Sequence, residues 1–190
     1  VGGDSRRVGE MTVMEDEADD VVRRIVMMRA AVVKSPWSCS GRGVRFVGGG
    51  LDASEEGWIR NTLKEQGCIM VEPHYDKLMD FAMEFMATSY GTEYLGLNIF
   101  NTQRGHYLHN EMMSEHDKRE RIEEHVGSGT IDTVRRNIVD LTSSLFRGRY
   151  EGPFGIDMMV VASDEGKQKV HPCVEMNLRR TMGNISSPPV

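Results

Sequence analysis

The stretch that decides the fold is a pair of apolar segments near the end of the chain, GIDMMVV at residues 155–161 and KVHPCVEMNLRR at residues 169–180. The sequence between them contains Asp164-Glu165-Gly166, which is typical of a tight turn. We therefore expect the two segments to pair as an antiparallel β-hairpin. Acidic residues inside these otherwise apolar strands, Asp157 and Glu175, then need a reason, because burying a charge is unfavourable.

Three polar side chains of the second strand are predicted to share one face. Side chains alternate between the two faces of a strand, so Glu175, Asn177 and Arg179 point to the same side. Asp157 lies beside them if the hairpin register runs through the predicted turn. Carboxylate and amide oxygens are hard ligands that suit Mg²⁺ together with phosphates, and an arginine suits a phosphate or carboxylate oxygen. From this segment alone, a solvated strand face with ordinary ion pairs is the alternative.

A second candidate site lies in AAVVKSPWSCSGRGVRFV, residues 30–47. A β-branched run ends at Lys34, a loop of small and hydroxyl residues follows, and a second strand begins near Gly43. Small residues let backbone N–H groups approach an anion, and the lysine supplies positive charge. The spacing fits neither the GxxxxGK[ST] loop nor a GxGxxG turn before a helix. The segment indicates a phosphate contact of another kind or, alternatively, a plain hairpin turn.

Composition bounds the class of protein. The 190 residues, of which 39% are hydrophobic and 27% charged, suffice for one domain or two small lobes. No apolar run reaches membrane-spanning length and the first residues lack a signal-peptide core, so no membrane partner is expected. Three scattered cysteines predict neither a disulfide framework nor a zinc site, which fits a reducing cytoplasmic compartment. The net charge of -6 argues against general nucleic-acid binding.

Hydrophobic periodicity and turn residues predict alternating hairpins and helices. In chain order we expect a helix after the acidic run 15–20, strands at 30–34 and from 43, a helix at 52–66, strands at 68–72, 78–88, 94–102 and 106–111, helices at 114–125 and 130–146, and the closing hairpin. This order favours an α+β architecture of two packed lobes.

Taken together, these motifs resemble the nucleotide-binding core of ATP-grasp ligases. The resemblance follows the order and spacing of Lys34 to Val44, Met70 to His74, Gly155 to Asp157 and Glu175 to Arg179, and it covers about residues 20–184. It implies an ATP-grasp-like fold, α+β, with two lobes of antiparallel sheet packed with helices and the nucleotide between them. The lobes implied are residues 1–67, with the phosphate-gripping loop, and residues 68–190, with the metal-binding hairpin. A substrate domain upstream of Val1 is expected to be missing.

The resemblance also implies a role for each candidate residue. The residues expected at the triphosphate are Lys34, Ser38, Ser40, Gly41, Arg42 and Gly43. The residues expected around the base and ribose are Met70, Val71, Glu72, His74 and Asp80, the last one residue away from the usual spacing. The residues expected to hold Mg²⁺, or Mn²⁺ in its place, are Asp157, Glu175 and Asn177. Arg179 is the expected catalytic residue, beside the acyl phosphate or carboxylate. From the residues alone, Met70 as core, Glu72 as a strand-end carboxylate and Asp80 as a surface charge stay open.

The activity that the resemblance implies is that of an ATP- and Mg²⁺-dependent ligase. Such an enzyme activates a small carboxylate as an acyl phosphate, which an amine or similar nucleophile then attacks; a homo-oligomer is compatible with this. A non-catalytic ATP-binding module and a small-molecule kinase are the alternatives. Two departures bear on the choice: a second phosphate-contacting lysine or arginine has no room ahead of Val1, and Gly155 stands where D-alanine–D-alanine ligase has an arginine.

Overall fold

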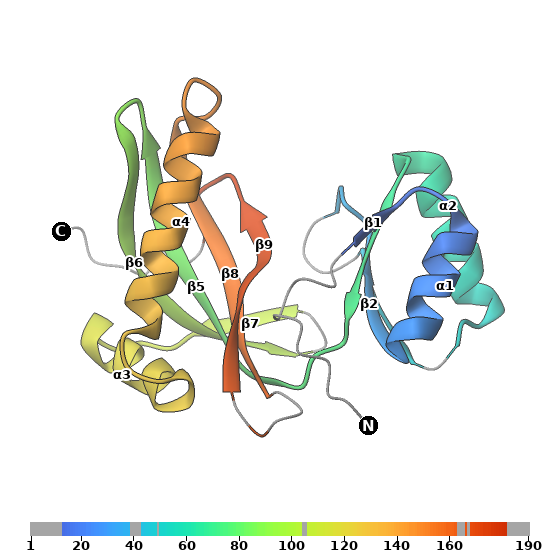
Figure 1. Cartoon of the computed structure of the whole chain (residues 1–190), viewed down its shortest axis with the longest axis horizontal. Helices are drawn as coiled ribbons and strands as arrows, with labels where there is room; N and C mark the ends of the chain where they lie inside the picture. Colours follow the sequence, from blue (N-terminus) through green and yellow to red (C-terminus); the bar gives the residue numbers. More distant parts are fainter. Residues whose placement is uncertain are drawn as a thin grey trace. The chain divides into compact units, whose positions relative to one another are not determined.

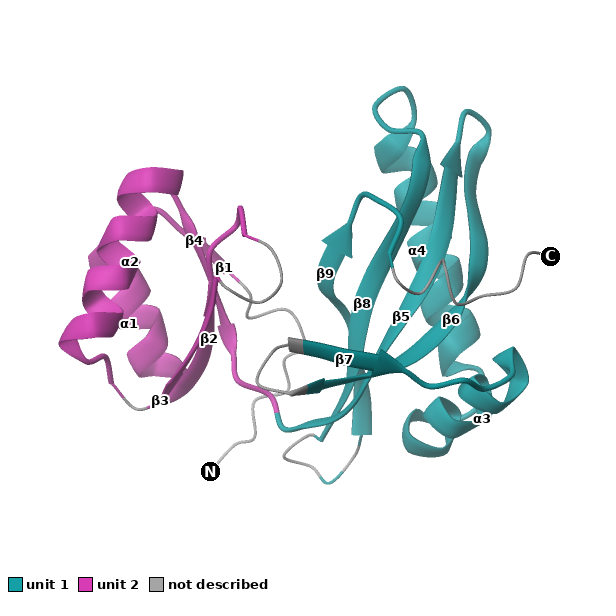
Figure 2. Cartoon of the chain, turned by 180° about the vertical axis from the view of Figure 1, so that it is seen from behind, with its two compact units in different colours: residues 1–3, 76–103, 107–190 teal, residues 4–75, 104–106 magenta. Residues whose placement is uncertain are grey.

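The structure is a computed structural model that describes residues 13–38, 43–48, 50–103, 106–162, 166 and 168–181. The chain splits into an N-terminal unit of residues 4–75 with 104–106 and a C-terminal unit of residues 76–103 and 107–190 with 1–3 (Figure 2). The division between Tyr75 and Asp76 comes later than the boundary expected between residues 67 and 68. Among the described helices, none combines the length and the apolar composition that crossing a membrane requires.

The N-terminal unit is a four-stranded sheet with two helices on one face (Figure 1). Its elements are β1 (Val13–Glu15), α1 (Ala18–Met28), β2 (Ala30–Lys34), β3 (Val44–Gly48), α2 (Ala53–Gln66) and β4 (Ile69–Pro73). The strand order is β1-β4-β2-β3, and the neighbouring strands pair antiparallel. The expected helices and strands of this region are present, and the short β1 is an addition that the sequence pattern did not predict.

Alternation along the strands decides which side chains face the helices. The buried core of this unit comprises Val21, Ile25, Ala31, Val33, Val47, Ile59, Ile69 and Val71. Because Val33 points into this core, the next residue, Lys34, points to the face that α1 and α2 do not cover, and Glu72 does the same after Val71. The sheet thus presents its charged pair away from its own helices.

The C-terminal unit is built around a five-stranded sheet of order β7-β6-β5-β8-β9. Its elements are β5 (Lys77–Thr88), β6 (Gly91–Gln103), β7 (His106–Asn110), α3 (Glu115–Val126), α4 (Thr130–Phe146), β8 (Gly152–Ala162) and β9 (Gln168–Asn177). Each of them lies near its predicted range, although β6 begins three residues earlier than expected and β9 ends at Asn177, before Arg179. The pairs β5–β6, β5–β8 and β8–β9 are antiparallel.

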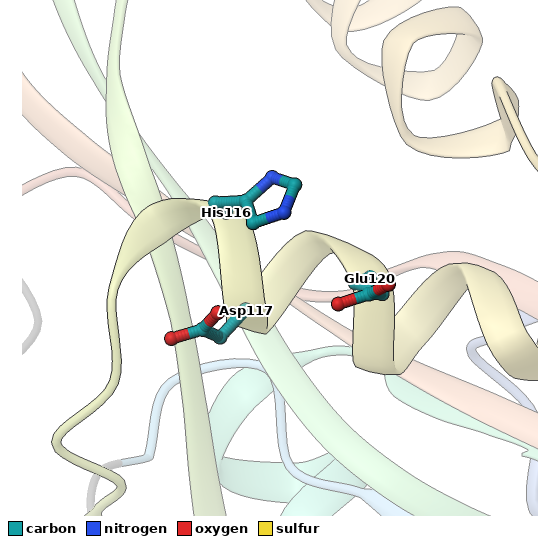
Figure 3. Close-up of side chains that lie close together, drawn as sticks. All are labelled: His116, Asp117 and Glu120. Carbon is teal, nitrogen blue, oxygen red and sulfur yellow. The ribbon is translucent and has the colours of Figure 1, made fainter.

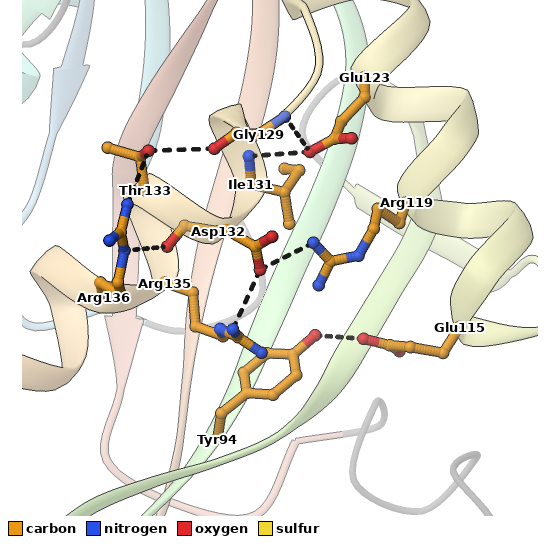
Figure 4. Close-up of polar contacts among 10 residues, drawn as sticks. All are labelled: Tyr94, Glu115, Arg119, Glu123, Gly129, Ile131, Asp132, Thr133, Arg135 and Arg136. Atoms are coloured by element: carbon orange, nitrogen blue, oxygen red, sulfur yellow. Dashed lines mark hydrogen bonds and ion pairs between the residues drawn. The ribbon is translucent and has the colours of Figure 1, made fainter.

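Helices α3 and α4 cover one face of this sheet (Figure 1). Their buried residues Ile122, Ile131, Ile138 and Phe146 pack on strand residues such as Phe81, Met83, Phe85, Leu97, Ile99, Phe154 and Ile156. The helices are also tied to each other, because Asp132 of α4 accepts from Arg119 of α3 at 2.8 Å (Figure 4). Glu123 accepts from the backbone N–H of Gly129 at 3.0 Å and so caps the start of α4. Strand residues of the opposite parity face away from the helices.

Helix α2 begins with a capping box, which gives a test of local stability. Asp52 accepts from Glu55 N at 2.8 Å, and the Glu55 side chain accepts from Asp52 N at 2.9 Å. We expect Asp52→Ala to lower the free energy of unfolding of the N-terminal unit by about 1 kcal/mol. Urea unfolding followed by tryptophan fluorescence measures this unit alone, since Trp37 and Trp58 are the two tryptophans of the chain. Glu56→Ala, a change at an exposed acid of the same turn, is the control, and an equal loss in both variants would contradict the capping assignment.

Candidate functional site

The register between β8 and β9 brings the expected metal ligands together on the face that α3 and α4 leave uncovered. Asp157 lies opposite Glu175, and Gly155 lies opposite Asn177. Asn177 Nδ2 donates to Asp157 Oδ2 at 3.2 Å. We call Asp157, Glu175, Asn177 and Arg179 the hairpin cluster. The sequence pattern predicted this hairpin and the shared face of Glu175 and Asn177 beside Asp157.

Asp157, a member of the hairpin cluster, has an unusually high pKa for a carboxyl group. Burial raises the pKa of Asp157 to about 7, and the nearby charges of Glu175, Glu84 and Asp80 add to this, while the hydrogen bond from Asn177 opposes it. Negative charge on Asp157 is therefore disfavoured by its own surroundings. A bound cation would stabilise the charged form of Asp157. Because Mg²⁺ prefers oxygen donors of this kind, the residues present fit a magnesium ion.

Arg179 lies in a bend directly after β9. Its backbone N–H donates to Asn177 O at 2.9 Å, and its Nη2 donates to Asn177 Oδ1 at 3.0 Å. Hydrogen bonds thus run from Arg179 to Asn177 and from Asn177 to Asp157. The arginine thus lies beside Asn177, one of the expected metal ligands, but in a bend and not on the strand where alternation predicted it.

Glu84 is a neighbour of the cluster that the sequence reasoning missed. It lies in the middle of β5, is only 2% exposed, and has a pKa raised chiefly by burial. Its Oε1 accepts from Thr181 Oγ1 at 2.6 Å. The signal available in the sequence was a single acid within FAMEFMA, residues 81–87, a run in which its neighbours are apolar.

Asp80 lies on the same face of β5 as Glu84 and is already engaged. It accepts from Lys77 Nζ at 2.5 Å and from Thr102 Oγ1 at 2.6 Å, and its strand partners are Phe100 and Met159. The lysine balances the charge of Asp80 and, with Thr102, holds the carboxylate in place. The Asp80 carboxylate is therefore held by two side-chain contacts, which a freely solvated surface charge would lack.

In the N-terminal unit, Lys34 and Glu72 form an ion pair on the uncovered face of the four-stranded sheet. Their side chains are 17% and 5% exposed, respectively. Met70 lies opposite Lys34, whereas Val71 is fully buried in the core and offers only its backbone. The backbone N–H of His74 donates to Ala30 O at 3.1 Å.

The loop after Lys34 is held at both of its described ends. Ser35 N donates to Gly43 O at 2.8 Å, and Ser38 Oγ donates to Ser35 O at 3.2 Å. A Cβ on Gly43 would lie 2.3 Å from Ser38 Oγ, so this position requires glycine. Ser35 Oγ also donates to Gln66 Oε1 at 2.9 Å, which fastens the loop to α2. Three expected phosphate contacts, Ser40, Gly41 and Arg42, lie outside the described residues.

Two other features carry no comparable chemistry. His116, Asp117 and Glu120 offer ligand atoms within 4.8 Å of one another, but all three are exposed near the start of α3 (Figure 3). A cavity of about 520 Å³ lies between α4 and β9 on the helix side of the sheet, with Val134, Ile138 and Met176 among its lining residues. Its walls are mainly apolar, and the hairpin cluster does not line it.

Comparison with known proteins identifies the fold of this chain through similar solved structures. No family model matches the sequence, and no curated protein matches it. Among solved structures, the biotin carboxylase β,γ-ATP complex from Campylobacter jejuni is similar, with a TM-score of 0.60 and 13% identity over 98% of this chain and 38% of that one.

Two further structures agree with this match. The ADP complex of N5-carboxyaminoimidazole synthetase from Staphylococcus aureus has a TM-score of 0.58 and 12% identity, covering 90% of this chain and 40% of that chain. D-alanyl-alanine synthetase A from Vibrio cholerae has a TM-score of 0.53 and 12% identity, covering 88% and 48%. The chain thus spans less than half the length of these three proteins. The described part of the chain, with two antiparallel sheets and four helices, has an ATP-grasp-like fold.

Proposed function

We propose that this chain is the ATP-binding core of a Mg²⁺-dependent ligase that activates a small carboxylate as an acyl phosphate for attack by an amine. The observation that carries the proposal is the grouping of Asp157, Glu175 and Asn177 on the uncovered face of the five-stranded sheet. Similar solved structures named as ADP and ATP complexes support the choice of nucleotide.

Each residue of the hairpin cluster has a proposed task. Asp157, Glu175 and the amide oxygen of Asn177 hold one or two Mg²⁺ ions, or Mn²⁺ in their place. The bound metal supplies positive charge to the phosphate oxygens during transfer. Arg179, anchored on Asn177, contacts the transferred phosphoryl group or the carboxylate and stabilises the negative charge that develops there. Since positioning and charge account for such a transfer, no nucleophilic side chain is needed.

The N-terminal unit contributes the remaining nucleotide contacts in this proposal. Lys34 contacts phosphate oxygens, and its ion pair with Glu72 keeps the ammonium group on the uncovered face. Backbone groups of the loop at Ser38 and Gly43, with Ser40, Gly41 and Arg42, bind the triphosphate. The base and ribose contacts are assigned to Met70, Val71, Glu72 and His74 of this unit and to Asp80, which lies on β5 of the C-terminal unit. The buried side chain of Val71 limits that residue to a backbone contact.

The metal assignment is tested by calorimetric titration of Mg-ATP. We expect Glu175→Ala combined with Asn177→Ala to weaken binding on the order of 100-fold, because two of the proposed ligands are removed. The matched control is Glu120→Ala with Asn137→Ala, which removes the same chemical groups from exposed positions of α3 and α4. Equal affinity in the wild type and the cluster variant would refute the metal assignment.

The raised pKa of Asp157 predicts that the charged form of this residue lowers the stability of the metal-free protein. The folded pKa is about 7, above the ordinary value of 3.8, so folding takes up a proton between these pH values and stability falls as pH rises through this window. Asp157→Asn removes the disfavoured charge. In the absence of metal, we expect its Tm at pH 8 to exceed that of the wild type, by about 2–4 °C per kcal/mol gained, with no difference at pH 4. Calorimetric scans at both pH values measure this, and a Tm difference that does not change with pH would contradict it.

The reaction class is tested by release of ADP. The longest soluble form of the protein is incubated with Mg-ATP and panels of carboxylates and amines. We expect ADP release that requires one member of each panel, and its loss in Arg179→Met. Release that requires only an alcohol would identify a kinase, and binding of ATP without turnover for any pair would favour a non-catalytic module.

A further inference from the structure

Glu84 is buried where the fold does not need a charge. It lies at the centre of β5 on the face opposite α3 and α4, between Phe85 and Met83, which point into the core. Burying a carboxyl group lowers stability unless specific contacts compensate. Because Glu84 lies beside the hairpin cluster, contacts with the residues of that region are the ones that can compensate for its burial.

The neighbouring strands leave room for this side chain. The cross-strand partners of Glu84 are Gly96 on β6 and Gly155 on β8. A Cβ on Gly155 would lie 2.8 Å from Glu84 Oε2 and 2.7 Å from Thr181 Cγ2. Glycine at position 155 thus allows the carboxylate and Thr181 to lie against β8.

The contacts of Glu84 lead to the segment that carries Arg179. Thr181 Oγ1 donates to Glu84 Oε1 at 2.6 Å, which ties the chain after β9 to the middle of β5. Asn98 Nδ2 donates to the same oxygen at 3.5 Å. Arg179 lies two residues before Thr181, and its positive charge favours the charged form of Glu84. Attraction between these two charges is mutual.

Arg179 is thus held from two sides. On one side its guanidinium donates to Asn177 Oδ1 at 3.0 Å. On the other side, the chain two residues further on is fixed by the bond between Thr181 and Glu84. An arginine on a flexible segment would lose conformational entropy when it binds an anion, and a prearranged one loses less.

We infer that Glu84 is a positioning residue for Arg179: through Thr181 and through its own charge it holds the guanidinium where an anion beside the metal ligands binds. This inference rests on the proposed function of the hairpin cluster. Glu84 does not touch the reacting groups. Its effect passes through Arg179.

The first test needs no ligand. The side-chain N–H signals of Arg179 are identified by NMR from their loss in Arg179→Lys. Glu84→Gln removes the charge that attracts Arg179, and Thr181→Val removes the hydrogen bond to Glu84. In each variant we expect the exchange of these N–H groups with water to rise about tenfold. The control is Thr142→Val, which removes a buried threonine hydroxyl that donates to Ile138 O at 2.7 Å in α4. Unchanged Arg179 exchange in both variants, or an equal rise in the control, would overturn the inference.

The second test measures binding of Mg-ATP and Mg-ADP. We expect Glu84→Gln to weaken Mg-ATP about tenfold while Mg-ADP changes less than twofold, because the terminal phosphate is the group that Arg179 would contact. In an Arg179→Met background, Glu84→Gln should have no further effect. A full additional loss in that background, or equal loss for both nucleotides, would overturn the inference. If the wild type binds neither nucleotide, the proposed function fails, and the NMR measurement still decides the role of Glu84.

Discussion

The register between β8 and β9 is the constraint on which the candidate site depends. Because side chains alternate along a strand, a slip of one residue would turn Asp157, Glu175 or Asn177 to the helix-covered face. The apolar residues fix the register: Ile156 and Met158 belong to the core beneath α3 and α4, and their burial leaves Asp157 pointing the other way. Packing on the helix-covered face of the sheet therefore determines which polar residues lie on the uncovered face.

The uncovered face of the C-terminal unit gathers more negative charge than packing alone would favour. Glu84 and Asp157 both have raised pKa values caused mainly by burial, and each lies close enough to other charges to be affected by them. Such an arrangement lowers the stability of the isolated fold, which is the usual signature of residues kept for binding or catalysis. The helix network of Arg119, Asp132 and Arg135 contrasts with it, since there the charges pair and stabilise one another.

The sequence predicted the helices, the principal strands and the shared face of Glu175 and Asn177, because these follow from local periodicity and capping. Arg179 was expected on the same strand, but β9 ends at Asn177 and Arg179 lies in a bend. Asp52 and Gly67 mark the two ends of α2 in both the sequence and the structure. Strand β1 was missed because three residues carry too little periodicity, and it forms by pairing with β4, far along the chain. Glu84 was missed for a related reason: its role depends on Gly155 and Thr181, and only the folded sheet brings these residues to it.

Charge balance on the same face bears on how a nucleotide would bind. Among the described residues, Lys77 pairs with Asp80, and the positive charge of Arg179 favours the charged form of Glu84. Asp157 and Glu175 add negative charge beside it, so a free triphosphate would meet repulsion at the hairpin cluster. A divalent cation reverses the sign of that interaction, because it neutralises the carboxylates and attracts phosphate oxygens at once. Under the proposed function, this arrangement would favour the metal–nucleotide complex over the free nucleotide, with Arg179 held beside the anion that the metal brings.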